Sequence, residues 1–148
     1  HPLNRRQRQM CIRDRQEQYS MTKLRSGIDL VKVSRLAKAY ENFGLRFLNR
    51  IYDNLEIEQF QKKSSRAKPF FLAKNFAGKE AVSKVIGYGF TNGVRPKDIV
   101  ILRKYGGPKV KLNGRAKLLA KEQGLKDISL SLSDTEEHAT AMAVAITE

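Results

Sequence analysis

Residues 69–89 constrain the fold of this chain more than any other stretch, because they carry a long helical pattern that stops at two glycines. The apolar residues at helical spacing are Phe70, Leu72, Ala73, Phe76, Ala77, Ala81 and Val85. Pro69 suits a first helical turn, where its missing N–H is no loss, and Gly87 and Gly89 break the pattern. We therefore predict one helix here, packed through its apolar face into the core.

Glu80 and Lys84 are four residues apart on this predicted helix, so their side chains share or border one face. A carboxylate with lysines around it suits an anionic ligand that a metal ion bridges. An ordinary Glu–Lys surface pair is the alternative, and the helix by itself leaves that alternative open.

Length and charge limit the classes of protein to which the chain can belong. Its 148 residues, 41% of them hydrophobic, fit one globular domain. The formal net charge of +14 indicates an acidic partner, whether nucleic acid, phosphorylated cofactor or acidic protein. The single cysteine, Cys11, excludes an internal disulfide and fits a reducing cytosol. No apolar run approaches the roughly 20 residues that span a bilayer.

Residues 1–22 differ from the rest because they are rich in Arg and Gln and nearly free of apolar residues. They contain no apolar segment of the kind found in secretory signals. The chain opens on His1, and Met21 is a candidate for the true start. We expect 1–22 to be a basic tail that is disordered or non-native, with a nucleic-acid arm as the alternative, and 23–148 to be the domain.

The order of elements indicates an α+β domain. We predict strands at 24–33, 98–103, 109–112, 128–132 and 139–146, and helices at 34–42, 54–60, 69–86 and 115–123, with 46–52 either helical or extended. Neighbouring strands joined by short turns favour antiparallel pairing. The predicted architecture is therefore a small antiparallel sheet with helices packed on one face.

Asp29 lies inside a predicted strand, where a carboxylate is disfavoured, so it needs a turn, a salt bridge or a metal to explain it. Gly27, two residues earlier, permits a close backbone approach. Ser129, Ser131 and Ser133 share one face of a later strand, where they either donate to phosphate or face water. The chain has no phosphate-loop motif and no histidine pair at metal spacing.

Several short motifs occur together. They are Gly27-Ile28-Asp29, Arg35, Phe71-Leu72-Ala73, the segment from Phe76 through Lys79-Glu80-Ala81 to Lys84, Gly87-Tyr88-Gly89, Asp98-Ile99, Gly107-Pro108, Ser129-Leu130-Ser131, and Ala139 and Ala141. In this order and spacing the chain, from about Leu24 to its end, resembles the holo-[acyl-carrier-protein] synthases. These are the small 4′-phosphopantetheinyl transferases of bacterial fatty acid synthesis.

The resemblance implies a reaction and a catalytic centre. The 4′-phosphopantetheine arm of coenzyme A moves to a serine of apo-acyl carrier protein, and adenosine 3′,5′-bisphosphate is released. Mg²⁺ is implied at Asp29 and Glu80, which agrees with its preference for one or two carboxylates plus phosphate oxygens. The resemblance also implies that Lys84 meets phosphate and that Glu56 orients water. Lys79 either meets phosphate too or is structural, because it points elsewhere on the helix. The general base is left open between Asp29, Glu56 and a water molecule.

The resemblance also implies binding surfaces and an assembly. Coenzyme A contacts are implied at Lys79, Lys84, Gly87, Gly107, Pro108, Ser131 and Asp134. Arg35, Arg46 and Phe47 are implied to face the acidic carrier protein, which their charge would steer. The family further implies a homotrimer in the cytoplasm, with no nucleic-acid or membrane partner.

Three positions depart from the family pattern, and one of them is Gly78, where an alanine is common. Asn75 stands where an arginine is usual and Asp134 where a histidine is usual, and both positions are expected near coenzyme A phosphates. A catalytically weakened transferase-like protein is therefore one alternative. A basic RNA-binding module is the other, although aromatic residues are not interleaved with the basic ones as base-stacking proteins require.

Overall fold

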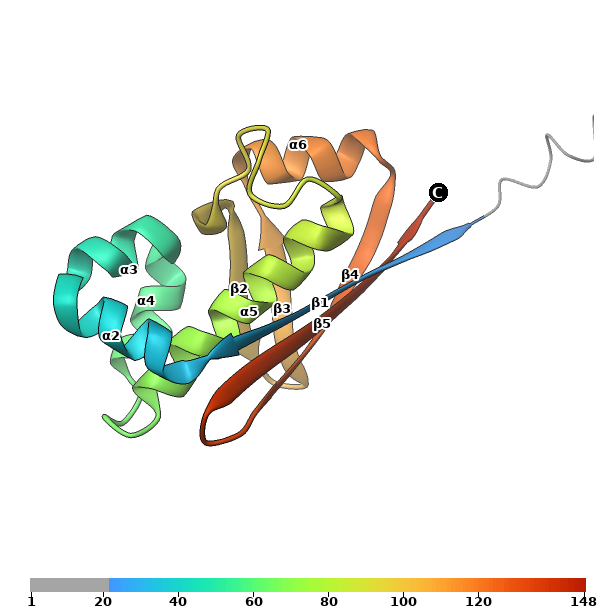
Figure 1. Ribbon diagram of the computed structural model, residues 1–148. Helices are drawn as coiled ribbons and strands as arrows, with labels where there is room; N and C mark the ends of the chain where they lie inside the picture. Colours follow the sequence, from blue (N-terminus) through green and yellow to red (C-terminus); the bar gives the residue numbers. More distant parts are fainter. Residues whose placement is uncertain (1–21) are drawn as a thin grey trace, which may run out of the picture.

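The computed structural model describes residues 22–148, so the prediction of a basic tail lies outside the described residues except for Thr22 (Figure 1). The elements in chain order are β1 (Lys23–Lys32), α2 (Val33–Phe43), α3 (Leu45–Ile51), α4 (Asn54–Gln61), α5 (Lys68–Ile86), the 3₁₀ turn η1 (Pro96–Asp98), β2 (Ile99–Lys104), β3 (Gly107–Leu112), α6 (Gly114–Glu122), β4 (Leu125–Asp134) and β5 (His138–Thr147). The predicted α+β class is confirmed. Within 22–148, no helix has the length and apolar character needed to cross a bilayer.

The strands form two antiparallel sheets where the sequence predicted one. β5 lies at the centre of a three-stranded sheet with β1 and β4 on either side, and β2 pairs only with β3 in a separate hairpin. Helix α6 separates the hairpin from β4 in the chain, so β3 has no short turn through which to join the larger sheet. β1 and β5, the first and last strands, run side by side across the molecule (Figure 1).

Helix α5 is the centre of the domain, and it is buried on nearly all sides. It packs against all three strands of the larger sheet, against β2, and against α2, α4 and α6. The prediction of one apolar face was therefore too narrow, since Asn75, Lys79 and Ser83 are buried along with the apolar residues. Phe71 is in the core, whereas Phe70 is only partly buried. Gly87 ends the helix in a left-handed conformation with φ of 97°, as predicted.

Gly27 lets β1 cross α5 at very short range. A Cβ atom at this position would lie 2.1 Å from the carbonyl oxygen of Ala81 and 3.0 Å from the Cβ of Lys84. Only glycine fits such an approach without moving backbone. The predicted close approach is thus confirmed, and Asp29 lies beside the C-terminal half of α5, where it pairs with Lys84.

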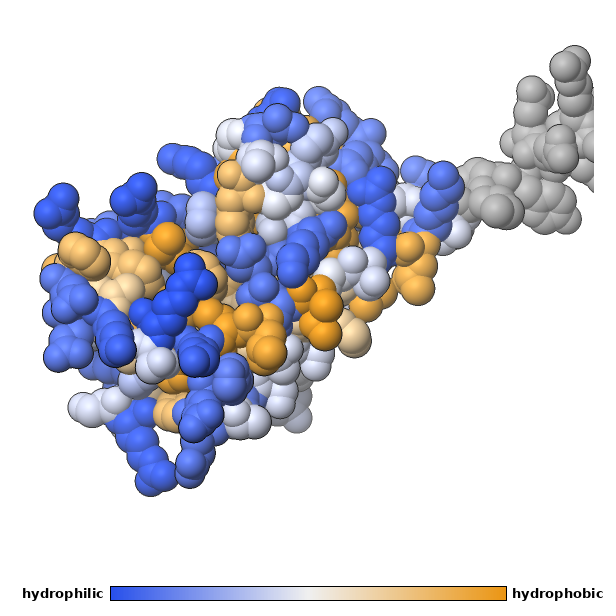
Figure 2. Space-filling view, in the orientation of Figure 1, coloured by the Kyte–Doolittle hydropathy of each residue, from blue (hydrophilic) through white to orange (hydrophobic). Residues whose placement is uncertain are grey.

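The face of the larger sheet that turns away from α5 is apolar, and no other element within residues 22–148 covers it. Leu24, Ile28 and Leu30 of β1 are 71%, 65% and 66% exposed, and Met142, which pairs with Ile28, is 50% exposed. Figure 2 shows hydrophobic residues in a band that follows β1. Monomeric proteins rarely expose a contiguous apolar patch of this kind without a partner.

The ends of three elements are set by local contacts and sequence. Asp53 caps α4 through a complete capping box with Glu56. Helix α2 begins at Val33, directly after β1, without a side-chain cap. Gly107 and Pro108 are the first residues of β3.

Candidate active site

Asp29 and Glu80 lie close together where β1 crosses α5. Burial is the main cause that raises the pKa of the Glu80 carboxyl, and the negative charge of Asp29 raises it further. Burial also raises the pKa of Asp29, although the ammonium group of Lys84 opposes that effect. A carboxylate whose pKa is raised by burial and by a neighbouring carboxylate forms, with that neighbour, a site where a cation is favoured. The structure thus brings together the two predicted metal ligands.

Lys84 and Arg35 provide positive charge at the edge of this carboxylate pair. The Nζ atom of Lys84 lies 3.6 Å from an Asp29 carboxylate oxygen and donates to the backbone oxygen of Ile28 at 2.6 Å. Half of the Lys84 side chain remains exposed, so it can meet an incoming phosphate. Arg35 on α2 lies over the ring of Phe76 at 5.7 Å, and its charge lowers the pKa of both Asp29 and Glu80.

The donor set at this site fits Mg²⁺ held partly by a substrate. Within residues 22–148, no group of three or more His, Cys, Asp or Glu side chains converges on one point. A structural zinc or a protein-caged calcium needs more protein ligands than two carboxylates provide. Mg²⁺ commonly binds to one or two carboxylates while phosphate oxygens and water complete its shell. The pair Asp29 and Glu80 matches that pattern.

Glu56 and Lys79 form a second, separate carboxylate–lysine pair, and both side chains are fully buried. The Nζ atom of Lys79 donates to Glu56 at 2.6 Å, to the Ile99 oxygen at 2.5 Å and to the Pro96 oxygen at 3.0 Å. Burial raises the pKa of Glu56 and lowers that of Lys79, and the attraction between the two charges opposes both shifts.

These contacts do not fit the roles implied for the buried pair. An ammonium group has three protons, and all three of Lys79 are already donated inside the protein. Glu56 accepts from Lys79, from Asn75 and from the Asp53 backbone. Neither side chain is open to phosphate or solvent, so phosphate binding by Lys79 and catalysis by Glu56 are corrected to a structural role.

The remaining implied coenzyme A residues lie in three places. Gly87 and Lys84 line one open cavity of about 450 Å³ at the end of α5. Ser131 is exposed on the outer face of β4, opposite Met142. Gly107 and Pro108 lie in the separate hairpin, where Pro108 pairs with Arg103. This chain by itself therefore does not gather them into one pocket.

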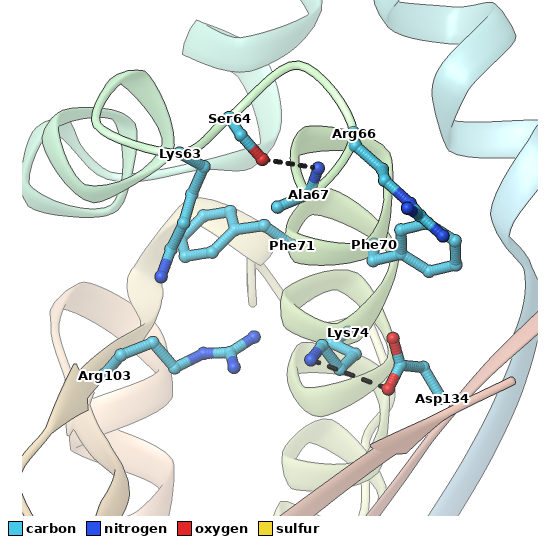
Figure 3. A pocket seen from close by; sticks show the side chains of 9 residues that line it. All are labelled: Lys63, Ser64, Arg66, Ala67, Phe70, Phe71, Lys74, Arg103 and Asp134. Atoms are coloured by element: carbon cyan, nitrogen blue, oxygen red, sulfur yellow. Dashed lines mark hydrogen bonds and ion pairs between the residues drawn. The ribbon is translucent and has the colours of Figure 1, made fainter.

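Asp134 lines a different cavity, of about 330 Å³, between the start of α5, β2 and the end of β4 (Figure 3). The nine lining residues are Lys63, Ser64, Arg66, Ala67, Phe70, Phe71, Lys74, Arg103 and Asp134. Asp134 pairs with Lys74 at 3.8 Å, so three further cations remain to face a ligand. The chemistry of this cavity suits an anion.

The implied carrier-protein residues divide between two surfaces. Arg46 and Phe47 line a groove of about 740 Å³ along α2 and α3, together with Phe43 and Arg50. Phe43 is 61% exposed, which makes the groove both apolar and basic. Arg35 is not part of its lining and lies instead near the carboxylate pair.

Sequence reasoning missed Arg103, Arg50 and Phe43 as site residues. Arg103 had no signal, because it sits in a strand that was recognised only from its β-branched neighbours. Phe43 and Arg50 had a weak signal, since both flank Arg46 and Phe47 at the spacing of neighbouring helical turns.

Comparisons with known proteins show the family of the chain. The family model described as "4'-phosphopantetheinyl transferase superfamily" matches residues 25–143. The holo-[acyl-carrier-protein] synthase of Halorhodospira halophila is 38% identical over 82% of this chain and 95% of its own length.

Solved structures show the same fold. The holo-[acyl-carrier-protein] synthase of Neisseria meningitidis superposes with a TM-score of 0.73 at 33% identity, over 82% of this chain and 96% of the other. That of Helicobacter pylori, solved in complex with coenzyme A, gives 0.70 at 28% identity, over 81% and 98%. The matched region contains the carboxylate pair, the α5 helix and the crossing strand, and the chain belongs to the 4′-phosphopantetheinyl transferase superfamily.

Proposed function

We propose that this protein transfers the 4′-phosphopantetheine group of coenzyme A to a serine of apo-acyl carrier protein, with adenosine 3′,5′-bisphosphate as the other product. The observation that carries the proposal is the Asp29–Glu80 carboxylate pair beside the half-exposed Lys84, at the crossing of β1 and α5. The relatives reported above bear the name of this reaction, and one of their structures holds coenzyme A.

Asp29 and Glu80 would hold Mg²⁺, and Lys84 would bind a phosphate oxygen of the coenzyme A diphosphate. When bound, the ion supplies charge neutralisation at the diphosphate and at the bridging oxygen that leaves. Lys84 is placed for this role because its ammonium group already lies at the rim of the carboxylate pair. Arg35 adds a second positive charge beside the same pair.

The attacking serine hydroxyl of the carrier protein must lose its proton. Glu56 is enclosed in the core and cannot reach that proton. The base is therefore Asp29 or a water molecule held near the carboxylate pair, as general acid–base catalysis requires a group within hydrogen-bond reach.

The carrier protein would dock on the groove along α2 and α3. Arg46 and Arg50 provide positive charge beside the exposed ring of Phe43, which suits an acidic amphipathic helix. Charge reversal in Arg46→Glu should raise the KM for the carrier about 10-fold and leave kcat unchanged, with a smaller effect at high salt. Lys117→Glu, on the distant α6, is the matched control. An equal KM for both variants would exclude this groove as the docking surface.

A homotrimer in the cytoplasm is proposed as the working assembly. The apolar outer face of β1 and β5 is the support for self-association. Met142→Asp should shift the molar mass measured by light scattering towards that of one chain. If the wild-type protein itself has the molar mass of one chain, the proposed assembly is contradicted.

The experiment that tests the proposal measures transfer of a fluorescent phosphopantetheine arm from labelled coenzyme A to an apo-acyl carrier protein. Transfer should require Mg²⁺ and stop when a chelator is added. Coenzyme A binding without transfer would favour a weakened transferase-like protein. Steeply salt-dependent RNA binding without coenzyme A binding would favour a basic RNA-binding module.

A further inference from the structure

Arg103 forms one wall of the 330 Å³ cavity, and hydrogen bonds hold both its backbone and its side chain. Gln59 holds the backbone. The side-chain amide of Gln59 on α4 accepts from the Arg103 N–H at 2.9 Å and donates to the Arg103 backbone oxygen at 3.0 Å. This edge of β2 is thus paired with a side chain where a neighbouring strand would otherwise lie.

The guanidinium group of Arg103 is fixed as well. Its Nε and Nη2 atoms donate to the side-chain oxygen of Asn75 at 3.2 and 2.9 Å. The group also lies over the ring of Phe71 at 5.2 Å. A long arginine side chain normally loses much rotamer freedom on binding a ligand, and here that freedom is already lost.

The orientation of Asn75 explains why it offers an oxygen to Arg103. Its amide nitrogen donates to Glu56 at 3.0 Å and to the Ile101 backbone oxygen at 3.1 Å, and both of these partners are acceptors. The nitrogen must therefore point towards them, and the oxygen must point towards the guanidinium. The fully buried Glu56–Lys79 pair thus sets the position of Arg103 through one intermediate residue.

The contacts leave one side of the guanidinium for a ligand. Arginine has five N–H donors, and in residues 22–148 the guanidinium makes hydrogen bonds only to Asn75. Figure 3 shows the group extending into the cavity towards Lys74, with Lys63 on its other side. Planar N–H groups fixed in this way match two oxygens of one phosphate.

The other lining residues favour the same ligand class. Lys63 and Arg66 add positive charge, and the one lining carboxylate, Asp134, is paired with Lys74. Phe70 adds a partly buried aromatic ring on which a base can stack. Charge and an aromatic surface together suit a phosphorylated nucleoside.

We propose that Arg103 is a phosphate-binding residue for the nucleotide part of coenzyme A. This inference rests on the proposed function. It gives Asn75 a new role: where the family pattern has an arginine on the helix, this chain uses the asparagine to hold an arginine that arrives from β2. Coenzyme A carries both a 3′-phosphate and a diphosphate, and the test separates them.

The test is calorimetric titration of coenzyme A, and of coenzyme A lacking the 3′-phosphate, into the full chain with Mg²⁺ present. Arg103→Gln should weaken coenzyme A binding 10- to 100-fold. Lys104→Gln changes the next residue, which is exposed, and should stay within twofold of wild type. Arg103→Lys keeps the charge but loses the planar fork, so we expect a smaller loss of about threefold to 10-fold. If Arg103→Gln lowers the melting temperature, the coenzyme A affinity of Arg103→Lys decides whether Arg103 binds phosphate.

The two ligands identify the phosphate. A loss confined to coenzyme A assigns Arg103 to the 3′-phosphate, and an equal loss for both ligands assigns it to the diphosphate. Binding of both ligands by Arg103→Gln and Arg103→Lys within twofold of wild type would overturn the inference, while wild-type transfer activity would leave the proposed function standing. A wild-type protein that neither binds coenzyme A nor transfers its arm would overturn both.

Discussion

The carboxylate–lysine pairs Glu56–Lys79 and Asp29–Lys84 both take their lysine from helix α5, and they differ in how completely their hydrogen bonds are satisfied. Glu56 and Lys79 are both 0% exposed, and every proton of the lysine is donated inside the protein. At the other pair Lys84 is 50% exposed, and its distance to Asp29 is 3.6 Å. The same residue types therefore stabilise the fold in one place and remain open to a ligand in the other.

The reason for the difference lies in the elements around each pair. Lys79 faces η1 and β2, whose backbone oxygens lie where its protons point. Glu80 is the next residue along the helix, so it points about 100° away, towards β1. There it meets a second carboxylate, Asp29, and the two negative charges need a cation.

Removal of the buried lysine should have the largest effect on stability. Lys79→Met leaves the Glu56 carboxylate buried without its cation, and breaking a buried pair in this way costs about 3–5 kcal/mol. Urea unfolding followed by circular dichroism measures the loss. Lys84→Met is the matched variant at the open pair and should cost under about 1 kcal/mol. An equal loss of unfolding free energy in Lys79→Met and Lys84→Met would show that the two pairs contribute alike to stability.

Removal of the Glu80 carboxylate, which lies beside the open Asp29–Lys84 pair, should affect activity and spare the fold. Glu80→Gln should lower kcat/KM for transfer at least about 100-fold, which corresponds to about 2.7 kcal/mol of transition-state stabilisation. The unfolding midpoint in urea should stay at or above the wild-type value, because the variant removes the repulsion between Glu80 and Asp29. Full activity in Glu80→Gln would rule out the metal assignment.

The crossing point that creates the open pair can be altered separately. Gly27→Ala places a methyl group 2.1 Å from the Ala81 oxygen, so strand and helix must move apart. We expect a loss of about 2 kcal/mol in stability, within the range for overpacked sites, together with reduced transfer activity because Asp29 moves. Ser26→Ala, on the exposed side of the same strand, is the control and should be neutral. A Gly27→Ala protein with wild-type stability would show that the close approach is not required.

The sequence predicted the local part of this arrangement well. The α5 helix with its glycine stop and the strand that carries Gly27 and Asp29 both follow from short-range patterns. Asp29 and Glu80 were predicted to act together only because of the resemblance to a family, since they are 51 positions apart in the sequence.

The buried pair could not be separated from the open one by sequence. Helical spacing places Lys79 on a different side from Glu80 and Lys84, which left a structural role open for it, but the spacing does not reveal that this side faces the core. Because charged residues are rarely fully buried in proteins, the residue types of Lys79 and Glu56 favoured exposed side chains. Arg103 was missed for a related reason: its partners Gln59 and Asn75 lie on two other elements, and no periodic pattern links them.

The central claim is that Asp29 and Glu80 together hold the metal ion that the reaction needs. The most direct measurement is the transfer rate of metal-stripped protein as Mg²⁺ is added back, for wild type and for Asp29→Asn. Wild type should be inactive without the ion and recover fully as Mg²⁺ rises, while Asp29→Asn should recover only slightly at the same concentrations. Metal-independent transfer by wild type, or an identical Mg²⁺ response in the variant, would contradict the account.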